Sequence, residues 1–140
     1  MVRILIAEDD GALRYDMAEM VVSWGFEVRA VAAGLAAFRL MKEWRPHLVL
    51  SDINMPHVSG FDLVRYNTTL KSDCADMVFI LISAMSAPKM IDAGLHAGAD
   101  DYITKPVDYN LLKAKIEEHL DKKRNFLASI ALKMDLHQSN

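Results

Sequence analysis

The stretch Leu48-Val49-Leu50-Ser51-Asp52-Ile53-Asn54-Met55-Pro56-His57-Val58-Ser59-Gly60 begins as a short apolar run, which is typical of a strand buried on both faces of a sheet. The carboxylate of Asp52 follows where this run ends. A charge in that position costs free energy unless it is solvated, paired or bound to a metal. Pro56 and Gly60 then predict a constrained loop before the next helix. Because ligands of open parallel sheets bind beyond the carboxyl ends of the strands, Asp52 is the first candidate for chemistry.

The composition is that of an ordinary globular domain. The chain has 140 residues, of which 52% are hydrophobic and 25% charged, and this fits one domain with a sizeable core. A formal net charge of -3 argues against direct binding of nucleic acid or of an anionic membrane surface. The single cysteine, Cys74, excludes an internal disulfide and fits a reducing compartment. Without a signal peptide or an apolar run of about 18 residues, a cytoplasmic protein is expected.

Strand patterns alternate with helix patterns along the chain. Short apolar or alternating runs predict five strands, over residues 4–7, 26–30, 47–51, 77–82 and 101–104. Apolar spacing and capping residues predict helices after Gly11, from Gly34, after Gly60, over residues 88–97 and after Asp108. This alternation predicts an α/β fold in which a parallel sheet carries helices on both faces.

The order of the strands follows from which of them have a polar face. The second and fifth strands alternate polar and apolar residues and therefore belong at the edges, whereas the other three are mainly apolar. This pattern predicts a doubly wound five-stranded parallel sheet with the flavodoxin-like order 2-1-3-4-5 and five helices. The switch point of that order lies between the first and third strands.

Chemically useful side chains follow four of the five strands. The carboxyl ends of strands one, three, four and five deliver Asp9 and Asp10, Asp52, Ser83 and Lys105. Carboxylates about 4 Å apart repel by roughly 4 kcal/mol per pair at an effective dielectric of about 20, so the cluster calls for a cation, and oxygen ligands suit Mg²⁺. A carboxylate nucleophile, a hard metal, an ammonium and a hydroxyl can together stabilise a phosphoryl group in transfer. Asp10 can alternatively serve only as the N-cap of the first helix.

Four stretches contain these side chains and their neighbours. They are Ile4-Leu5-Ile6-Ala7-Glu8-Asp9-Asp10, Leu50-Ser51-Asp52-Ile53-Asn54-Met55-Pro56 with Gly60, Ile82-Ser83-Ala84, and Gly98-Ala99-Asp100-Asp101-Tyr102-Ile103-Thr104-Lys105-Pro106. Together they resemble the receiver domain of a bacterial two-component response regulator. The resemblance covers about residues 1–120, which leaves residues 121–140 as a helical C-terminal extension or linker.

The resemblance implies phosphorelay signalling rather than turnover of a substrate. Asp52 would accept a phosphoryl group from a sensor histidine kinase or a phosphotransfer protein, with self-catalysed phosphotransfer and dephosphorylation. Asp9, Asp10 and Asp52 would bind Mg²⁺ together with the backbone carbonyl of Asn54.

The resemblance also implies a switch. Ser83 and Lys105 would contact the phosphoryl oxygens, Tyr102 would be the aromatic switch residue, and the peptide bond before Pro106 would be cis. Phosphorylation would then change the surface of the fourth helix, fifth strand and fifth helix, which would control a partner or an output domain. That surface, or the C-terminal helix, is a possible site of homodimerisation.

Two other functions compete with this prediction. A phosphatase of the haloacid dehalogenase type also uses a strand-end Asp as nucleophile, but that family places a second Asp two residues later, where this chain has Asn54. A degenerate receiver that serves only as a binding module is the other alternative, although the acidic residues, Ser83 and Lys105 are all present.

The C-terminal stretch continues a helical pattern. The following residues are spaced alternately four and three apart: Ile116, Leu120, Lys123, Leu127, Ile130 and Met134. Lys123 interrupts the apolar seam, and the pattern covers too few heptads for a coiled coil to be assigned. A solvated helix extension, a dimerising helix and a linker to an output domain all remain open for residues 121–140.

Overall fold

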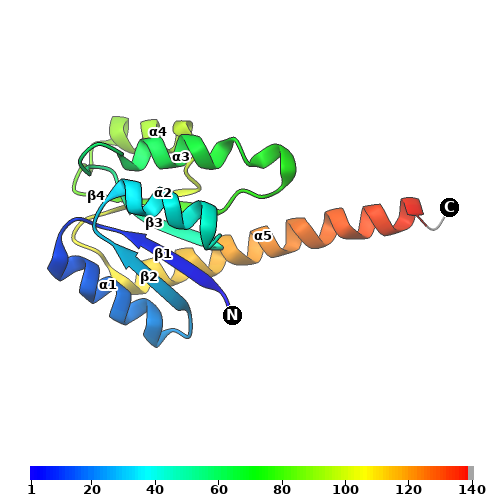
Figure 1. Cartoon of the computed structure of the whole chain (residues 1–140), viewed down its shortest axis with the longest axis horizontal. Coiled ribbons are helices and arrows are strands. Elements are labelled where there is room, and N and C mark those ends of the chain that lie inside the picture. The colour runs from blue at the N-terminus through cyan, green and yellow to red at the C-terminus, as the bar shows by residue number, and fades with distance from the viewer. Residues whose placement is uncertain (139–140) are drawn as a thin grey trace.

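The computed structural model describes residues 1–138, in which strands and helices alternate along the chain (Figure 1). The strands are β1 (Arg3–Ala7), β2 (Glu27–Val31), β3 (Leu48–Asp52), β4 (Val78–Ser83) and β5 (Asp101–Thr104). The helices are α1 (Gly11–Ser23), α2 (Gly34–Glu43), α3 (Gly60–Thr68), α4 (Pro88–Ala97) and α5 (Tyr109–Gln138), and a short 3-10 turn, η1 (Lys71–Asp73), precedes β4.

The five strands form one parallel sheet in the order β2-β1-β3-β4-β5, which confirms the predicted flavodoxin-like topology. Every residue of β3 and β4 is buried, as their apolar sequences predict. The strands β2 and β5 lie at the edges, and β2 keeps an exposed side. Local polarity therefore predicts the place of each strand in the sheet.

Two hydrophobic layers cover the sheet, because successive strand residues point to opposite faces. Leu5 and Phe79 belong to the core under α2, α3 and α4. Ile6 and Ile80 belong to the second core, under α1 and α5. Figure 1 shows these two groups of helices on opposite sides of the sheet. This sandwich leaves the strand ends free to carry the functional side chains.

The helix α5 is more than twice as long as any other helix. Its first turns pack on the sheet through Leu112 and Ile116, whereas Phe126 and Met134 further along are exposed. The helix runs without a break past residue 120 and protrudes from the body (Figure 1). Residues 139 and 140 of the expected extension lie outside the described residues. Within residues 1–138, no helix has both the length and the apolarity that crossing a membrane requires.

Asn67 connects the end of α3 to the start of β4. Its side chain is buried, its Nδ2 donates to the Met77 carbonyl at 2.7 Å, and its Oδ1 accepts from the Met77 N–H at 2.8 Å. Both polar groups of a buried backbone residue are thereby satisfied by one side chain. This pair of bonds fixes the point at which the central strand β4 enters the sheet.

Asn67→Ala is expected to lower the free energy of unfolding by about 2 kcal/mol or more, since each buried polar group left without a partner costs about 1–3 kcal/mol. Urea denaturation monitored by circular dichroism measures this loss. The exposed Asn125 on α5 provides the control, because Asn125→Ala should change stability by less than about 0.5 kcal/mol. Equal effects of the two substitutions would contradict a structural role for the Asn67 bonds.

Candidate functional site

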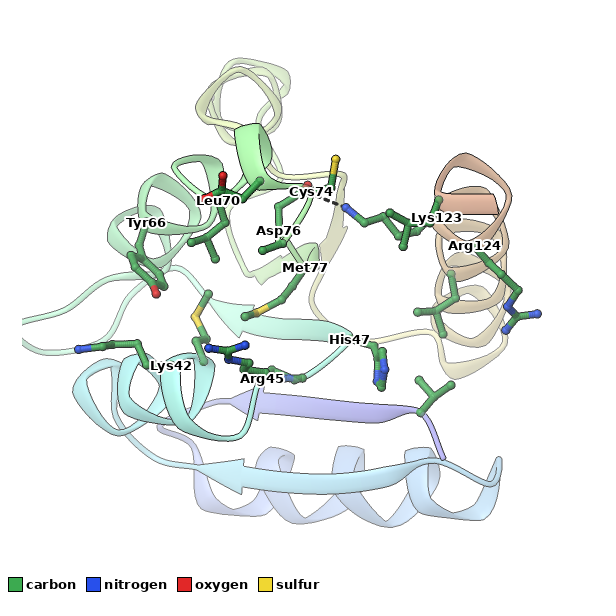
Figure 2. A pocket seen from close by; sticks show the side chains of 17 residues that line it. Lys42, Arg45, His47, Tyr66, Leu70, Cys74, Asp76, Met77, Lys123 and Arg124 are labelled. Carbon is green, nitrogen blue, oxygen red and sulfur yellow. Dashed lines mark hydrogen bonds and ion pairs between the residues drawn. The ribbon is translucent and has the colours of Figure 1, made fainter. Parts of the chain in front are cut away.

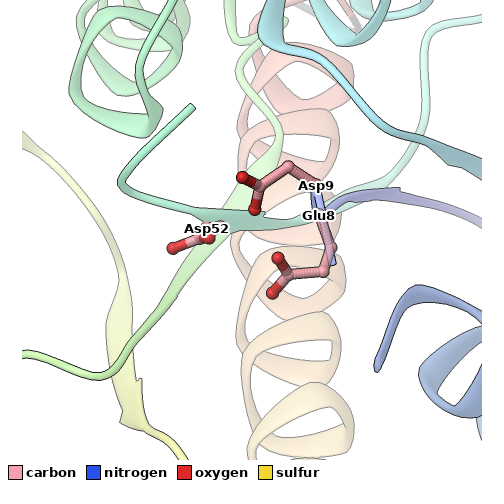
Figure 3. Close-up of side chains that lie close together, drawn as sticks. All are labelled: Glu8, Asp9 and Asp52. Carbon is pink, nitrogen blue, oxygen red and sulfur yellow. The ribbon is translucent and has the colours of Figure 1, made fainter. Parts of the chain in front are cut away.

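Three carboxylates converge where β1 and β3 end (Figure 3). Glu8 and Asp9 follow β1, Asp52 ends β3, and one oxygen of each lies within 4.8 Å of the other two. Glu8 is fully buried and Asp52 is 7% exposed, whereas Asp9 faces solvent. The parallel pairing of β1 with β3 brings them together, because Ala7 lies in register with Ser51. These three residues are called the acidic cluster below.

Lys105 provides a positive charge at the acidic cluster. Its backbone N–H donates to the Ser83 carbonyl at 2.8 Å, so the residue continues the pairing of β5 with β4. Its Nζ lies 2.7 Å from Glu8 Oε1 and 3.3 Å from Asp52 Oδ2. Burial alone would lower the pKa of Lys105, but the two carboxylates outweigh this effect and raise the pKa. The ammonium therefore stays charged between them.

The environment shifts the pKa values of Glu8 and Asp9 in opposite directions. Burial raises the pKa of Glu8, although its contact with Lys105 acts in the opposite direction. A side-chain hydrogen bond with Glu8 is the main cause of the lowered pKa of Asp9. Glu8 Oε1 pairs with the Lys105 ammonium, and Glu8 Oε2 accepts from the Asp10 N–H at 3.1 Å.

The acidic cluster fits a hard divalent cation. All its donors are carboxylate oxygens, which Mg²⁺ prefers over sulfur or nitrogen ligands. Glu8, Asp9 and Asp52 each offer one carboxylate oxygen to the same point, and the exposed Asp9 leaves one side open to water. A cation at this position would also relieve the repulsion that a single ammonium only partly offsets.

Asp10, which the sequence analysis places among the metal ligands, lies outside the acidic cluster. Its Oδ1 accepts from the Leu13 N–H at 3.1 Å and caps α1, which is the alternative role named above. Glu8 lies in the cluster instead, because its N–H donates to the Val31 carbonyl at 3.0 Å and continues the strand pairing by one residue. Glu8 therefore lies on the same face of the sheet as Ile6, at the end of a strand that is buried on both faces.

Ser83 and Tyr102 are bonded to the same backbone residue, Met85. Ser83 Oγ accepts from the Met85 N–H at 3.1 Å, and the Tyr102 hydroxyl donates to the Met85 carbonyl at 2.7 Å. Ser83 is buried at the end of β4, one residue after Ile82, the register partner of Asp52. The Tyr102 ring lies against α4 beside Gly94, where an added Cβ would come within about 3.0 Å of the ring. Met85 thus connects the hydroxyl at the strand end to the ring on β5.

The loop after β3 is held close to Asp52. The Asn54 N–H points toward Asp52 Oδ1 at 3.4 Å, and the Gly60 N–H donates to the Ile53 carbonyl at 2.9 Å. A Cβ at Gly60 would overlap the carbonyl oxygen of Asp52, so this close approach requires glycine. At the end of β5, the peptide bond before Pro106 is cis. Of the metal ligands expected from the sequence, Asp10 is the one whose carboxylate lies outside the acidic cluster, where it caps α1.

Comparison with protein families gives one match, to the model described as the response regulator receiver domain, over residues 4–117. The matched range contains the acidic cluster, Ser83, Tyr102 and Lys105. It ends before the exposed part of α5.

Curated relatives match the same part of the chain. The transcriptional regulatory protein AfsQ1 of Streptomyces coelicolor is 33% identical over 116 residues, which are 83% of this chain and 50% of the relative. The DNA-binding response regulator MtrA of Mycobacterium tuberculosis is 31% identical over 118 residues, which are 84% of this chain and 50% of the relative. The chain therefore spans about half the length of these relatives.

Solved structures show the same fold. A CheY-like response regulator receiver domain protein from Methanospirillum hungatei is 30% identical, with a TM-score of 0.80 over 89% of this chain and 98% of that one. The BeF3-activated N-terminal receiver domain of RstA from Klebsiella pneumoniae is 25% identical, with a TM-score of 0.77 over 84% of this chain and 97% of that one.

Lys105→Ala is expected to destabilise the metal-free protein by about 3 kcal/mol at neutral pH, because it leaves buried carboxylates without their cation. The loss should shrink in acid. The pKa of Glu8 is raised in the folded protein, so Glu8 takes up a proton as the pH falls and the unpaired charge disappears. Urea denaturation with EDTA, repeated between about pH 7.5 and pH 4.5, measures both effects.

The exposed Lys113 on α5 is the matched control. Lys113→Ala should change stability by less than about 0.5 kcal/mol at every pH. A loss for Lys105→Ala that is small, or equal at both ends of the pH range, would show that the ammonium does not compensate the buried carboxylates.

Proposed function

Because this chain belongs to the family of response regulator receiver domains, we propose that it is phosphorylated on Asp52 and acts as a switch in a phosphorelay. The observation that supports this most directly is the arrangement around Asp52. Its side chain is 8% exposed, lies 3.3 Å from the Lys105 ammonium and belongs to a cluster of three carboxylates. The combination of an accessible nucleophilic oxygen, a fixed cation and a set of metal ligands suits phosphoryl transfer and little else.

In the proposed reaction, an oxygen of Asp52 attacks the phosphorus atom of the donor. A bond forms between that oxygen and phosphorus, the bond from phosphorus to the donor breaks, and the donor atom keeps the electron pair. Lys105 lies on the side of Asp52 Oδ2, where its ammonium can neutralise negative charge on the phosphoryl oxygens. Ser83 would contribute a hydroxyl donor to another of these oxygens.

We assign the metal ligands to Glu8, Asp9 and Asp52, with the backbone carbonyl of Asn54 as the further ligand that the family resemblance implies. Bound Mg²⁺ would supply positive charge that offsets the phosphoryl oxygens and the carboxylates. Asp10 is not included, because its carboxylate caps α1. Glu8 is the better candidate because its carboxylate lies in the acidic cluster with Asp9 and Asp52.

The switch would act through Met85. When the Ser83 hydroxyl donates to a phosphoryl oxygen, the position of Ser83 Oγ changes and its bond from the Met85 N–H weakens. The Tyr102 hydroxyl is bonded to the carbonyl of the same residue, so a shift of Met85 also displaces Tyr102. The Tyr102 ring lies against α4 at Gly94, and the resulting change would appear on the surface formed by α4, β5 and α5.

A sensor histidine kinase or a phosphotransfer protein is the proposed donor, and the cytoplasm is the proposed location. The α4-β5-α5 surface is the proposed contact for a partner, an output domain or a second copy. The relative MtrA is named as DNA-binding, but this chain matches half of it and carries a net charge of -3. We therefore propose that the segment described here does not itself bind nucleic acid.

The family match favours this switch over the phosphatase alternative. A phosphatase of the haloacid dehalogenase type needs a second Asp two residues after the nucleophile as general acid, and Asn54 cannot transfer a proton in that way. The binding-module alternative is disfavoured by the presence of every reactive group in one site, since a domain that only binds has no need for them.

Incubation with acetyl phosphate and Mg²⁺ is expected to add one phosphoryl group, as intact-protein mass spectrometry will show, and none when EDTA replaces Mg²⁺. Asp52→Ala should remain unmodified, because the nucleophilic oxygen is lost. Glu8→Gln should reduce the modification at limiting Mg²⁺, because a neutral amide is a weaker ligand.

Asp10→Asn is the matched control for Glu8→Gln. Asn caps helices as well as Asp does, so this variant should fold normally and accept the phosphoryl group as the unmodified chain does. Modification of Asp52→Ala would contradict the assigned nucleophile. Loss of modification in Asp10→Asn but not in Glu8→Gln would contradict the proposed ligand set.

Beryllium trifluoride, which mimics a phosphoryl group on Asp52, is expected to shift amide resonances of α4, β5 and the start of α5 more than those of α2. Ser83→Ala removes the hydroxyl that reaches Met85 and should reduce the distant shifts to less than half, while shifts next to Asp52 remain. Two-dimensional ¹⁵N–¹H NMR measures both. Ser23→Ala at the end of α1 is the control and should leave all shifts unchanged, since its Oγ bonds only locally, to the Met20 carbonyl. Full-size distant shifts in Ser83→Ala would exclude this coupling.

A further inference from the structure

A groove of about 800 Å³ lies at the amino ends of the strands, beside α5 (Figure 2). The acidic cluster lies at the other end of the same strands. The groove is bounded by the segments that enter β1, β3 and β4, by the ends of α2 and α3, and by α5. Its apolar wall is formed by Met41, Leu70, Met77, Leu120 and Leu127. The groove is thus a hydrophobic recess between the body of the domain and the protruding helix, remote from the phosphorylation chemistry.

The helix α5 carries an apolar stripe that continues this groove. Leu120 and Leu127 line the groove, and Ile130, Ala131 and Met134 follow on the same side of the helix at spacings of three and four residues. Leu127 is 39% exposed and Met134 is 57% exposed. Contiguous apolar surface on a protruding helix is typical of an interaction site, because burying it against a partner lowers the free energy.

Lys123 fixes the direction of the protruding part. Its Nζ lies 2.6 Å from Asp76 Oδ1, and both side chains are largely buried, so this turn of α5 is tied to the loop before β4 (Figure 2). The ion pair also uses the charge of Lys123. Lys123 therefore does not oppose the burial of the apolar stripe, although it lies on the same side of the helix as Leu120 and Leu127.

Basic side chains predominate around the groove. Lys42, Arg45 and Arg124 line the groove, and Asp73 is the acidic lining residue besides the paired Asp76. Asp135 lies on the flank of the apolar stripe, whereas Lys133 lies on the far side of the helix. Because α5 runs without a break away from the groove, Asp135 of the same molecule cannot reach Arg124.

We propose that a second copy of this chain covers the groove, with the protruding parts of the two α5 helices packed antiparallel. Arg124 and Asp135 lie on the same flank of the apolar stripe, about three helical turns apart. Antiparallel packing brings Asp135 of the second copy beside Arg124 and, by two-fold symmetry, forms the same ion pair twice. Parallel packing would instead place Arg124 level with Arg124 of the second copy and about three helical turns from its Asp135, so this ion pair could not form.

Arg124 is free to make this contact. Its present ion pair, with Asp121 at 3.6 Å, joins side chains that are 70% and 66% exposed, and such a pair contributes little. In the dimer, the apolar stripe and groove supply the affinity and the two Arg124–Asp135 pairs set the direction. The contact needs neither the metal nor the phosphoryl group, so it is independent of the function proposed above.

Sedimentation velocity of the full chain, over a range of concentrations, tests the proposal. The unmodified chain is expected to dimerise. Arg124→Asp and Asp135→Arg should each raise the dimer Kd by about tenfold or more, because each turns two attractive pairs into two repulsive ones. An equimolar mixture of the two variants should dimerise again, and so should the double variant, since both restore opposite charges across the interface.

Both positions are exposed, so the variants are expected to fold, and circular dichroism verifies this. Lys122→Asp is the control, because it makes a similar charge change on the other side of α5 and should leave the Kd unchanged. A chain that stays monomeric at all concentrations would overturn the proposal and leave the groove to a different protein. Dimers that survive in each single variant, or that the mixture fails to restore, would overturn the antiparallel arrangement.

Discussion

The ion pairs of Lys105 with the buried carboxylates of Glu8 and Asp52 are the interactions on which the functional end of the sheet depends. Two carboxylates in one buried site repel each other and lose most of their hydration. A single ammonium offsets this only in part, as the raised pKa of Glu8 shows. The three groups lie at the carboxyl ends of β1, β3 and β5. A change in charge among them therefore alters the electrostatic interactions of three strands.

This charge balance explains how a small ligand can influence a rigid fold. The sheet itself is tightly packed and offers little freedom. The loop after β4 is different, because its Met85 is held by one hydrogen bond from the direction of the site and one from β5. In the proposed switch, the Ser83 hydroxyl would donate to an acceptor on Asp52, and the resulting movement of Ser83 Oγ would act on Met85, the backbone residue that Tyr102 also contacts.

The two ends of the sheet serve separate purposes in this arrangement. The carboxyl ends of the strands carry the acidic cluster, and the apolar groove lies at their amino ends, beside α5. The core between them is fully buried along β3 and β4. The helix α5 contributes both to the proposed switch surface and to the groove.

Local pattern in the sequence determined most of the fold and the identity of the reacting groups. Uninterrupted apolar runs mark central strands and alternating runs mark edges, so the order of the sheet is contained in short segments. Asp52, Ser83 and Lys105 are likewise visible, because Asp52 and Ser83 end strands, Lys105 follows one, and the carboxyl ends of parallel strands lie at the same end of the sheet. These features depend on neighbours in the chain, which is why a single sequence suffices to find them.

Contacts between distant segments were decided only by the tertiary structure. Three acidic residues follow β1 in succession, and the register of β1 with its neighbours selects Glu8 and Asp9 for the cluster while Asp10 caps a helix. The bonds from Ser83 and Tyr102 to Met85 join β4 to β5. The groove exists because α5 passes the entrances of β1, β3 and β4. Each of these depends on the relative placement of separate elements, which periodicity and composition do not encode.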